Sequence, residues 1–570
     1  MRELRWPRLL AVAWIVLGVA YAVSHIAAIW TESVNWDEFI LLYRAEKAAR
    51  TGVLDSGGRP GLVVVLLAPF VDGCSSAMST VQAMRIVWAF ITLALFAGVF
   101  ELARRAAWSA PRPWEAAALG TTAFALVPVV LRWSVQVRTD QLAICLALWG
   151  GVAALASHRR ASWAVLAGVL VGTGYLCSQK ALYVAGLTGF VVVADHWRRG
   201  DWVFRREVLR IALAITGAVV AVVAYRAIVP MLYTAPTPVG LERGLDLFRW
   251  YRSFFGYRVY AGLLPTLWPQ ILMLGLVVLA LARASRVRGA ALRTVGVAVV
   301  CALLGLGVGA FHAGAFPYFV ITLGVFLAVS VAIAWGPVLE LVPRTGPRIA
   351  LVAVSWMLLH AVPYRHETLI DTQRVQRETL ADAEALPATW RGFHPEGALV
   401  CRPDPSPLPF FVSESLAVRF QGPRAAEETA RLLDEMRDRP VAFLVRTHRL
   451  TAFPLPLVKF WNSHFVHYRG QLSLAGTKVE GPPGFQQVVD FHVAGRYRWW
   501  SDGAVLSVDG KPLRPGEAID LPAGVHTLLL AQGGGGSLML ATDRPPTPAG
   551  TGSFYDGMAL PEISGSRRDW

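Results

Sequence analysis

The sequence predicts an α-helical polytopic membrane protein of about eleven transmembrane helices, followed by a soluble C-terminal domain with α/β and β-sandwich parts. Two observations on the 570-residue chain support this fold class. Hydrophobic residues make up 55% of the chain and charged residues only 16%, which is outside the range of soluble globular proteins. Long apolar runs also fill the first two thirds of the chain and stop near residue 363, where proline, glycine and charged residues become frequent.

The apolar runs predict the individual spans. They begin near residues 9, 84, 114, 140, 162, 181, 209, 262, 293, 317 and 348. Each can cross roughly 30 Å of hydrocarbon if tilt and short spans are allowed. The first run follows Arg2, Arg5 and Arg8 without a small-residue cleavage site, which indicates an uncleaved span. The run over 62–71 is too short to cross, so we expect it at the membrane interface.

The distribution of arginine predicts the orientation. If the N-terminus is cytoplasmic, the Arg-rich loops near residues 104, 159, 198, 283 and 344 are all cytoplasmic, as the positive-inside rule requires. Because the number of spans is odd, the residues after about Tyr364 then lie on the external side of the membrane. The net charge of +15 is explained by these loops facing anionic lipid, so we expect no nucleic-acid partner.

Composition divides the chain into three parts. Residues 1–363 form the transmembrane domain, with 31–82 as its first external loop. Residues 364–480 are an exported α/β segment, and 481–570 a β-sandwich-like module. The tail is expected to contain an apolar stretch at 398–401, a helix at 425–437 and a strand at 441–445, and then short strands with a turn at Asp509-Gly510.

Two features of the soluble parts allow more than one interpretation. Trp499 and Trp500 could stack on a sugar, but an aromatic pair in a small β-domain more often packs in the core. The five cysteines show no metal-ligand spacing and no clear disulfide framework, and a bridge between Cys74 and Cys401 is one possible pairing.

Chemistry is expected at the external membrane edge. The first external loop begins Asn35-Trp36-Asp37-Glu38-Phe39, and two carboxylates beside lipid need water, a cation or a charged partner. One of them could act as a general base while its neighbour points elsewhere, toward a divalent metal or an arginine. The alternative is a solvated helix N-terminus rich in acidic residues.

Other external turns carry cations. The turn 132–140 contains Arg138, which could face a phosphate, and Lys180 ends the short turn Ser178-Gln179-Lys180, where it could also extend to lipid headgroups. His312 precedes Pro317-Tyr318 in a further turn. Carboxylates and cations on one membrane face suit transfer from an anionic lipid-linked donor, with a base for the acceptor and stabilisation of a departing phosphate.

These motifs resemble the GT-C superfamily of polyisoprenyl-phosphate-sugar glycosyltransferases, which includes protein mannosyltransferases and lipid A aminoarabinose transferases. The resemblance rests on Trp36-Asp37-Glu38, Val137-Arg138-Thr139-Asp140, Ser178-Gln179-Lys180-Ala181 and His312 with Pro317-Tyr318, and it covers roughly residues 1–363. It implies a GT-C-like fold and inverting transfer of a hexose or pentose from a polyprenyl-phosphate donor to a lipid, glycan or protein acceptor. It also implies a bacterial-type inner (plasma) membrane location with a periplasmic or extracellular C-terminal domain.

The resemblance also implies residue roles. Asp37 would be the general base with Glu38 as its competitor, Arg138 and Lys180 would bind the donor phosphate, and His312 and Tyr318 would line the donor pocket. Arg59 is a weaker candidate from the same loop as Asp37. A divalent metal is compatible with the carboxylates, and no other cofactor is expected.

Two other classes of function remain open. A lipid-carrier flippase or transporter would use the same charges along a transit path, but transporters place ionisable groups near mid-span, whereas these cluster at one face. A non-catalytic envelope assembly protein would depend on the tail and would not need Asp37.

Overall fold

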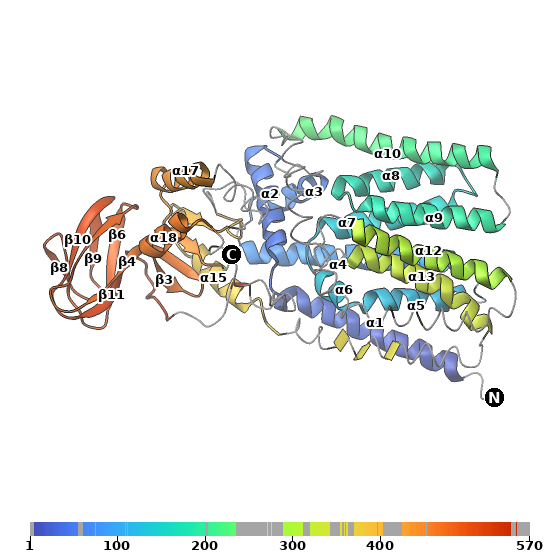
Figure 1. Cartoon of the computed structure of the whole chain (residues 1–570). Helices are drawn as coiled ribbons and strands as arrows, with labels where there is room; N and C mark the ends of the chain where they lie inside the picture. Colours follow the sequence, from blue (N-terminus) through green and yellow to red (C-terminus); the bar gives the residue numbers. More distant parts are fainter. Residues whose placement is uncertain are drawn as a thin grey trace. The chain divides into compact units, whose positions relative to one another are not determined.

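A computed structural model gives the arrangement of the helices and strands (Figure 1). It describes residues 5–54, 61–234, 289–311, 320–341, 370–402 and 425–548, except for gaps at 75, 109, 111, 200–202, 396, 448–449 and 451–452, and also the isolated positions 271, 275, 354–355, 358–359, 361–362 and 554–555. The chain divides into two compact units. Unit 1 comprises Met1–Glu32, Lys47–Pro69 and Gln82–Ile370, and unit 2 comprises Ser33–Glu46, Phe70–Val81 and Asp371–Trp570.

Helices make up the described part of unit 1. They are α1 (Arg5–Thr31), α3 (Leu62–Val71), α5 (Pro113–Ala125), α6 (Pro128–Trp133), α7 (Thr139–Ala156), α8 (Ser162–Cys177), α9 (Ala181–Arg199), α10 (Phe204–Leu232), α12 (Gly289–Phe311) and α13 (Val320–Leu341). The last two residues of α3 belong to unit 2. Two more helices, α2 (Trp36–Thr51) and α4 (Ala77–Ala106), begin in unit 2 and end in unit 1.

The apolar composition of these helices fits a membrane protein. Within the described ranges, three helices are long and apolar enough to cross a membrane, namely α4, α7 and α10. Shorter apolar segments lie in α1, α8, α9, α12 and α13. The expected spans near residues 262 and 348 lie largely outside the described residues, so the total of eleven stays a prediction. Helix α3 has 10 residues, in agreement with the expectation that this run is too short to cross.

The third expected span is interrupted. Helix α5 ends at Ala125, and Val127 has the extended values φ −65° and ψ 122° before Pro128 begins α6. Proline has no N–H to donate and disfavours helical geometry in the residue before it, which explains the break. The short helix α6 then leads into the turn that contains Arg138.

Helices α8 and α10 pack in direct backbone contact. A Cβ atom at Gly168 would lie 1.8 Å from the carbonyl oxygen of Ala214, and one at Gly217 would lie 2.2 Å from that of Val165. Gly168 and Gly172 are four residues apart and face the same neighbouring helix, the small-xxx-small arrangement of close membrane helix pairs. Only glycine fits at these contacts.

The described part of unit 2 contains two sheets and three further helices (Figure 1). The helices are α15 (Arg374–Glu384), α17 (Ala425–Asp438) and α18 (Leu455–His464). The strands are β1 (Gly392–Phe393), β2 (Phe443–Val445), β3 (Phe465–Arg469), β4 (Leu472–Gly481), β5 (Gln486–Phe491), β6 (Gly495–Ser501), β7 (Leu506–Val508), β8 (Lys511–Leu513), β9 (Ala518–Leu521), β10 (Gly524–Leu530) and β11 (Gly534–Leu540).

Strand β4 joins the α/β part of unit 2 to its β part. One sheet has the order β1-β2-β4-β11-β6-β9, with β3 also paired to β4, and the other has the order β5-β10-β7-β8. The β1–β2 pair is parallel and every other pair in these sheets is antiparallel. The first half of β4 pairs with β2 and β3, and the second half pairs with β11.

Aromatic packing holds the two sheets of the β part together. The rings of Phe491 on β5 and Tyr497 on β6 lie 4.8 Å apart in a T-shaped contact. Trp499 is fully buried and donates from Nε1 to the carbonyl of Ala504 at 2.7 Å. The packing interpretation is therefore correct for Trp499, whereas Trp500 is only half-buried.

Several expectations for the tail can be compared with the structure. The helix expected at 425–437 is α17, the strand expected at 441–445 is β2, and Asp509-Gly510 forms the β7–β8 turn with φ values of 50° and 82°. The stretch 398–401 is buried at Ala398, Leu399 and Val400 but forms no strand.

One disulfide joins distant parts of unit 2. Cys74 and Cys401 are bonded, with Cα atoms 5.5 Å apart and a sequence separation of 327 residues. The bridge that the sequence left open is therefore present. Cys145, Cys177 and Cys301 are buried free thiols.

Acid is expected to destabilise unit 2 through His492. Burial lowers the pKa of His492 to about 4, and its Nε2 lies 2.9 Å from the carbonyl of Val441. The folded-state pKa is lower than the unfolded value of about 6.5. The contribution of neutral His492 to the free energy of unfolding is therefore complete above pH 6.5 and is lost as the pH falls toward 4. At pH 5 the free energy of unfolding should be lower than at neutral pH by about 2 kcal/mol, which corresponds to a decrease in Tm of about 5 °C. His492→Gln keeps a donor for Val441 and should remove this part of the pH dependence in thermal melts, and an unchanged pH dependence would contradict the assignment.

Candidate functional site

The first group of candidate residues lies at the N-terminus of α2, in unit 2. Asn35 is the N-cap: its Oδ1 accepts from the backbone N–H of Asp37 at 2.9 Å. Glu38 completes a capping box, because its Oε2 accepts from the N–H of Asn35 at 2.9 Å. Glu38 is fully buried, whereas Asp37 is partly exposed. Of the two carboxylates, Glu38 therefore satisfies backbone donors, and Asp37 is the more accessible.

The second group surrounds Arg138 in unit 1. Arg138 precedes α7 in extended conformation, and its carbonyl accepts from Trp88 Nε1 at 2.9 Å. Its Nε donates to Oε1 of Gln136 at 3.0 Å, and its guanidinium lies 4.2 Å from the ring centre of Trp133. Stacking and the hydrogen bond fix the plane of the guanidinium, which suits the recognition of a planar or tetrahedral anion.

Lys180 belongs to the same group through Asp140. Lys180 Nζ donates to Asp140 Oδ2 at 2.5 Å, and the hydroxyl of Ser178 donates to Oδ1 at 2.7 Å. The Lys180 and Asp140 side chains are only 13% and 11% exposed. The turn before α9 and the first turn of α7 are thus joined by a shielded ion pair, which fixes the position of the Lys180 ammonium.

Three residues of this network were not singled out from the sequence. Gln136 Nε2 donates to Oε1 of Glu32 at 3.2 Å, and Arg85 donates from Nη1 to the carbonyl of Glu32 at 2.7 Å. Arg85 is fully buried and also donates to the carbonyl of Ile29 at 3.3 Å, so it caps the end of α1. An arginine inside the apolar run of α4 was the available signal, because a charge within a span requires buried partners.

Some candidates cannot be placed. Arg59, His312 and Tyr318 lie outside the described residues. Within the described ranges, no group of three or more histidine, cysteine, aspartate or glutamate side chains could hold a metal ion. Among the candidates that are placed, Arg138 and Lys180 share one network through Asp140, and Asp37 and Glu38 share the capping box.

Comparison with known proteins identifies the fold. No protein-family model and no curated protein sequence matches the chain. Among solved structures, ArnT from Cupriavidus metallidurans in the apo state superposes with a TM-score of 0.52 at 14% identity, over 82% of this chain and 98% of that one. The same protein bound to undecaprenyl phosphate gives a TM-score of 0.53 at 16% identity, over 82% and 98%. The chain therefore has the fold of these ArnT structures.

Proposed function

We propose that the protein is a membrane glycosyltransferase that transfers a sugar from a polyprenyl-phosphate donor to a lipid, glycan or protein acceptor. The observation that carries this proposal is the shielded network of Arg138, Asp140 and Lys180 in a chain with the ArnT fold. The ArnT structure bound to undecaprenyl phosphate supports a lipid-phosphate ligand for this fold.

The network has the composition of a phosphate site. Arg85, Arg138 and Lys180 supply three cations and Glu32 and Asp140 two carboxylates, so the network carries a net positive charge. Asp140 orients the ammonium of Lys180, and Gln136 orients the guanidinium of Arg138. Such preorganised cations stabilise the charge that develops on a departing phosphate.

Asp37 is the proposed general base. Its neighbour Glu38 is buried and accepts from the N–H of Asn35, whereas Asp37 is partly exposed, which favours Asp37 as the carboxylate that takes a proton from an acceptor hydroxyl. The hydroxyl oxygen forms the new bond to the anomeric carbon, the bond to the phosphate oxygen breaks, and the polyprenyl phosphate leaves with the electron pair. A single displacement of this kind inverts the configuration of the sugar.

The proposed reaction takes place outside the cytoplasm of a bacterium. Disulfides form and persist in oxidising compartments, and both Cys74 and Cys401 belong to unit 2. This supports a periplasmic location for unit 2 and for Asp37, in agreement with the orientation that the arginine distribution predicts.

Lys180→Ala is expected to lower kcat/KM for the polyprenyl-phosphate donor by about 100-fold or more, because a preorganised cation at the leaving phosphate is lost. The measurement is transfer of labelled sugar in membranes that contain the native or the variant chain. Lys459→Ala is the matched control, because Lys459 is exposed on α18 and its removal should leave the rate unchanged. Equal rates for native and Lys180→Ala membranes would exclude the proposed phosphate site.

A further inference from the structure

Helix α15 contains a buried polar residue whose two amide atoms are both used. Gln376 is fully buried; its Oε1 accepts from the N–H of Val34 at 2.6 Å, and its Nε2 donates to the carbonyl of Val34 at 2.9 Å. The amide of Gln376 thus binds both the N–H and the carbonyl of Val34, as the backbone of a neighbouring β-strand would. Close by, the hydroxyl of Thr372 accepts from the N–H of Ser33 at 2.9 Å.

These contacts hold the chain directly before α2. Val34 precedes the N-cap Asn35, whose side chain binds the N–H of Asp37. Hydrogen bonds therefore run from Gln376 through Val34 and Asn35 to the backbone of Asp37. Phe39, one turn further on, is fully buried against the rings of His394 and Phe554, each 6.1 Å away.

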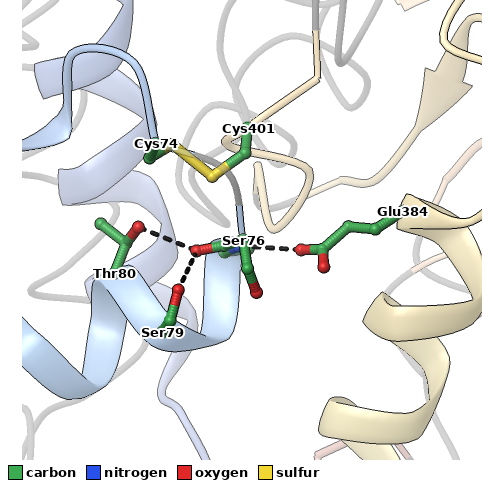
Figure 2. Close-up of a disulfide and its surroundings, with 7 residues drawn as sticks. Cys74, Ser76, Ser79, Thr80, Glu384 and Cys401 are labelled. Atoms are coloured by element: carbon green, nitrogen blue, oxygen red, sulfur yellow. Dashed lines mark hydrogen bonds between the residues drawn. A yellow bond between two sulfur atoms is a disulfide. The ribbon is translucent and has the colours of Figure 1, made fainter.

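The other end of α15 holds the beginning of α4 (Figure 2). Glu384 Oε1 accepts from the N–H of Ala77 at 2.8 Å and so caps the first turn of α4. The disulfide between Cys74 and Cys401 lies beside this contact (Figure 2). Arg402, next to Cys401, donates to the carbonyl of Ala383 in the last turn of α15 at 2.9 Å, and to that of Leu386 just after the helix at 3.2 Å.

We propose that α15 is a positioning helix that holds both ends of the first external loop, and that Gln376 is the positioning residue for Asp37. Unit 2 contains only two pieces of the N-terminal third of the chain, Ser33–Glu46 and Phe70–Val81, and α15 hydrogen-bonds to both. The catalytic part of this inference rests on the proposed function of Asp37. In this proposal the α/β segment contributes to catalysis by holding the backbone that carries Asp37, and it does not itself contact the substrate.

The test removes the pairing at Val34. In the full-length protein, Gln376→Leu should accelerate amide hydrogen exchange in the peptide 33–40 by roughly 10-fold or more. It should lower kcat by roughly 10- to 100-fold with little change in KM for the donor, because a small misplacement of a catalytic group affects the chemical step. Rates are normalised to the folded fraction, and Thr372→Val is a milder second variant if Gln376→Leu does not fold.

Gln376→Glu separates positioning from a general loss of stability. An ionised glutamate can accept from the N–H of Val34 but cannot donate to its carbonyl, whereas a protonated one can do both. The ratio of variant to native kcat should therefore rise toward one as the pH falls. Tyr497→Phe is the control, because it removes a 2.7 Å hydrogen bond to the carbonyl of Val493 in the β part of unit 2 and should change neither kcat nor exchange in 33–40.

The outcomes distinguish this inference from the proposed function. Unchanged exchange in both Gln376 variants would overturn the role of α15. Faster exchange with unchanged kcat, in a protein that Asp37→Asn inactivates, would overturn positioning and leave the proposed function intact. Absence of transfer activity in the native protein would overturn the proposed function. Amide hydrogen exchange in the peptide 33–40 would still decide whether α15 holds the loop.

Discussion

Asp37→Asn is expected to lower the kcat of sugar transfer by about 1,000-fold or more, within the usual range for the loss of a general base. Asparagine has nearly the same shape, and the contact from the Asp37 N–H to Asn35 Oδ1 belongs to the backbone, so the fold of the α2 N-terminus should be kept. The measurement is single-turnover transfer from a polyprenyl-phosphate-linked sugar, which isolates chemistry from product release.

Glu38→Gln is the matched comparison. Glutamine retains an acceptor oxygen for the N–H of Asn35, so the capping box can persist, and kcat should fall by less than about 10-fold. Glu38→Ala removes the acceptor and should cost about 1 kcal/mol of stability, also with a small effect on kcat. A large loss of kcat in Glu38→Gln with near-native Asp37→Asn would assign the base to Glu38.

Gly168→Leu should prevent the close packing of α8 and α10 and destabilise unit 1 by more than about 4 kcal/mol, an effect expected only for severe overpacking. The added Cβ alone would lie 1.8 Å from the backbone oxygen of Ala214, so the helices would have to separate. We expect a loss of folded, monodisperse protein in detergent, measured by size-exclusion chromatography of the fluorescently tagged chain.

Gly186→Leu controls for the substitution itself. Gly186 is exposed on α9, and apart from its own stretch of helix nothing lies within 4 Å of an added Cβ, so the same change in the same bundle should leave the folded yield near the native level. Equal yields from Gly168→Leu and native protein would show that α8 and α10 do not need the contact.

Much of the fold was predictable because hydrophobicity determines where a chain enters a membrane. Apolar length and charge located the helices α4, α7 and α10, and the shortness of the run at Leu62–Val71 was apparent from its composition. The break before Pro128 and the contact at Gly168 had signals in the sequence, a proline and a GxxxG spacing. These signals do not say which helix is the neighbour, because packing partners depend on tertiary structure.

The candidate site was predictable in its residue types but not in its pairings. Arg138 and Lys180 were found as cations in short polar turns, yet their link through Asp140 joins segments 40 residues apart. The role of Gln376 could not be found, since Gln376 and Val34 are 342 residues apart. A buried glutamine in an amphipathic helix resembles an exposed one until the partner is known. The capping box of Asn35 and Glu38 is local, and its spacing could have been recognised from the sequence.

The most direct test of the central claim is to offer the purified, reconstituted native protein two forms of the same labelled sugar, one on polyprenyl phosphate and one on a nucleotide diphosphate. A membrane extract supplies the lipid, glycan and protein acceptors. Transfer from the lipid-linked form alone, abolished by Asp37→Asn and strongly reduced by Lys180→Ala, is the predicted result. Transfer from the nucleotide-linked form, or movement of the lipid carrier across the bilayer without transfer, would contradict the claim.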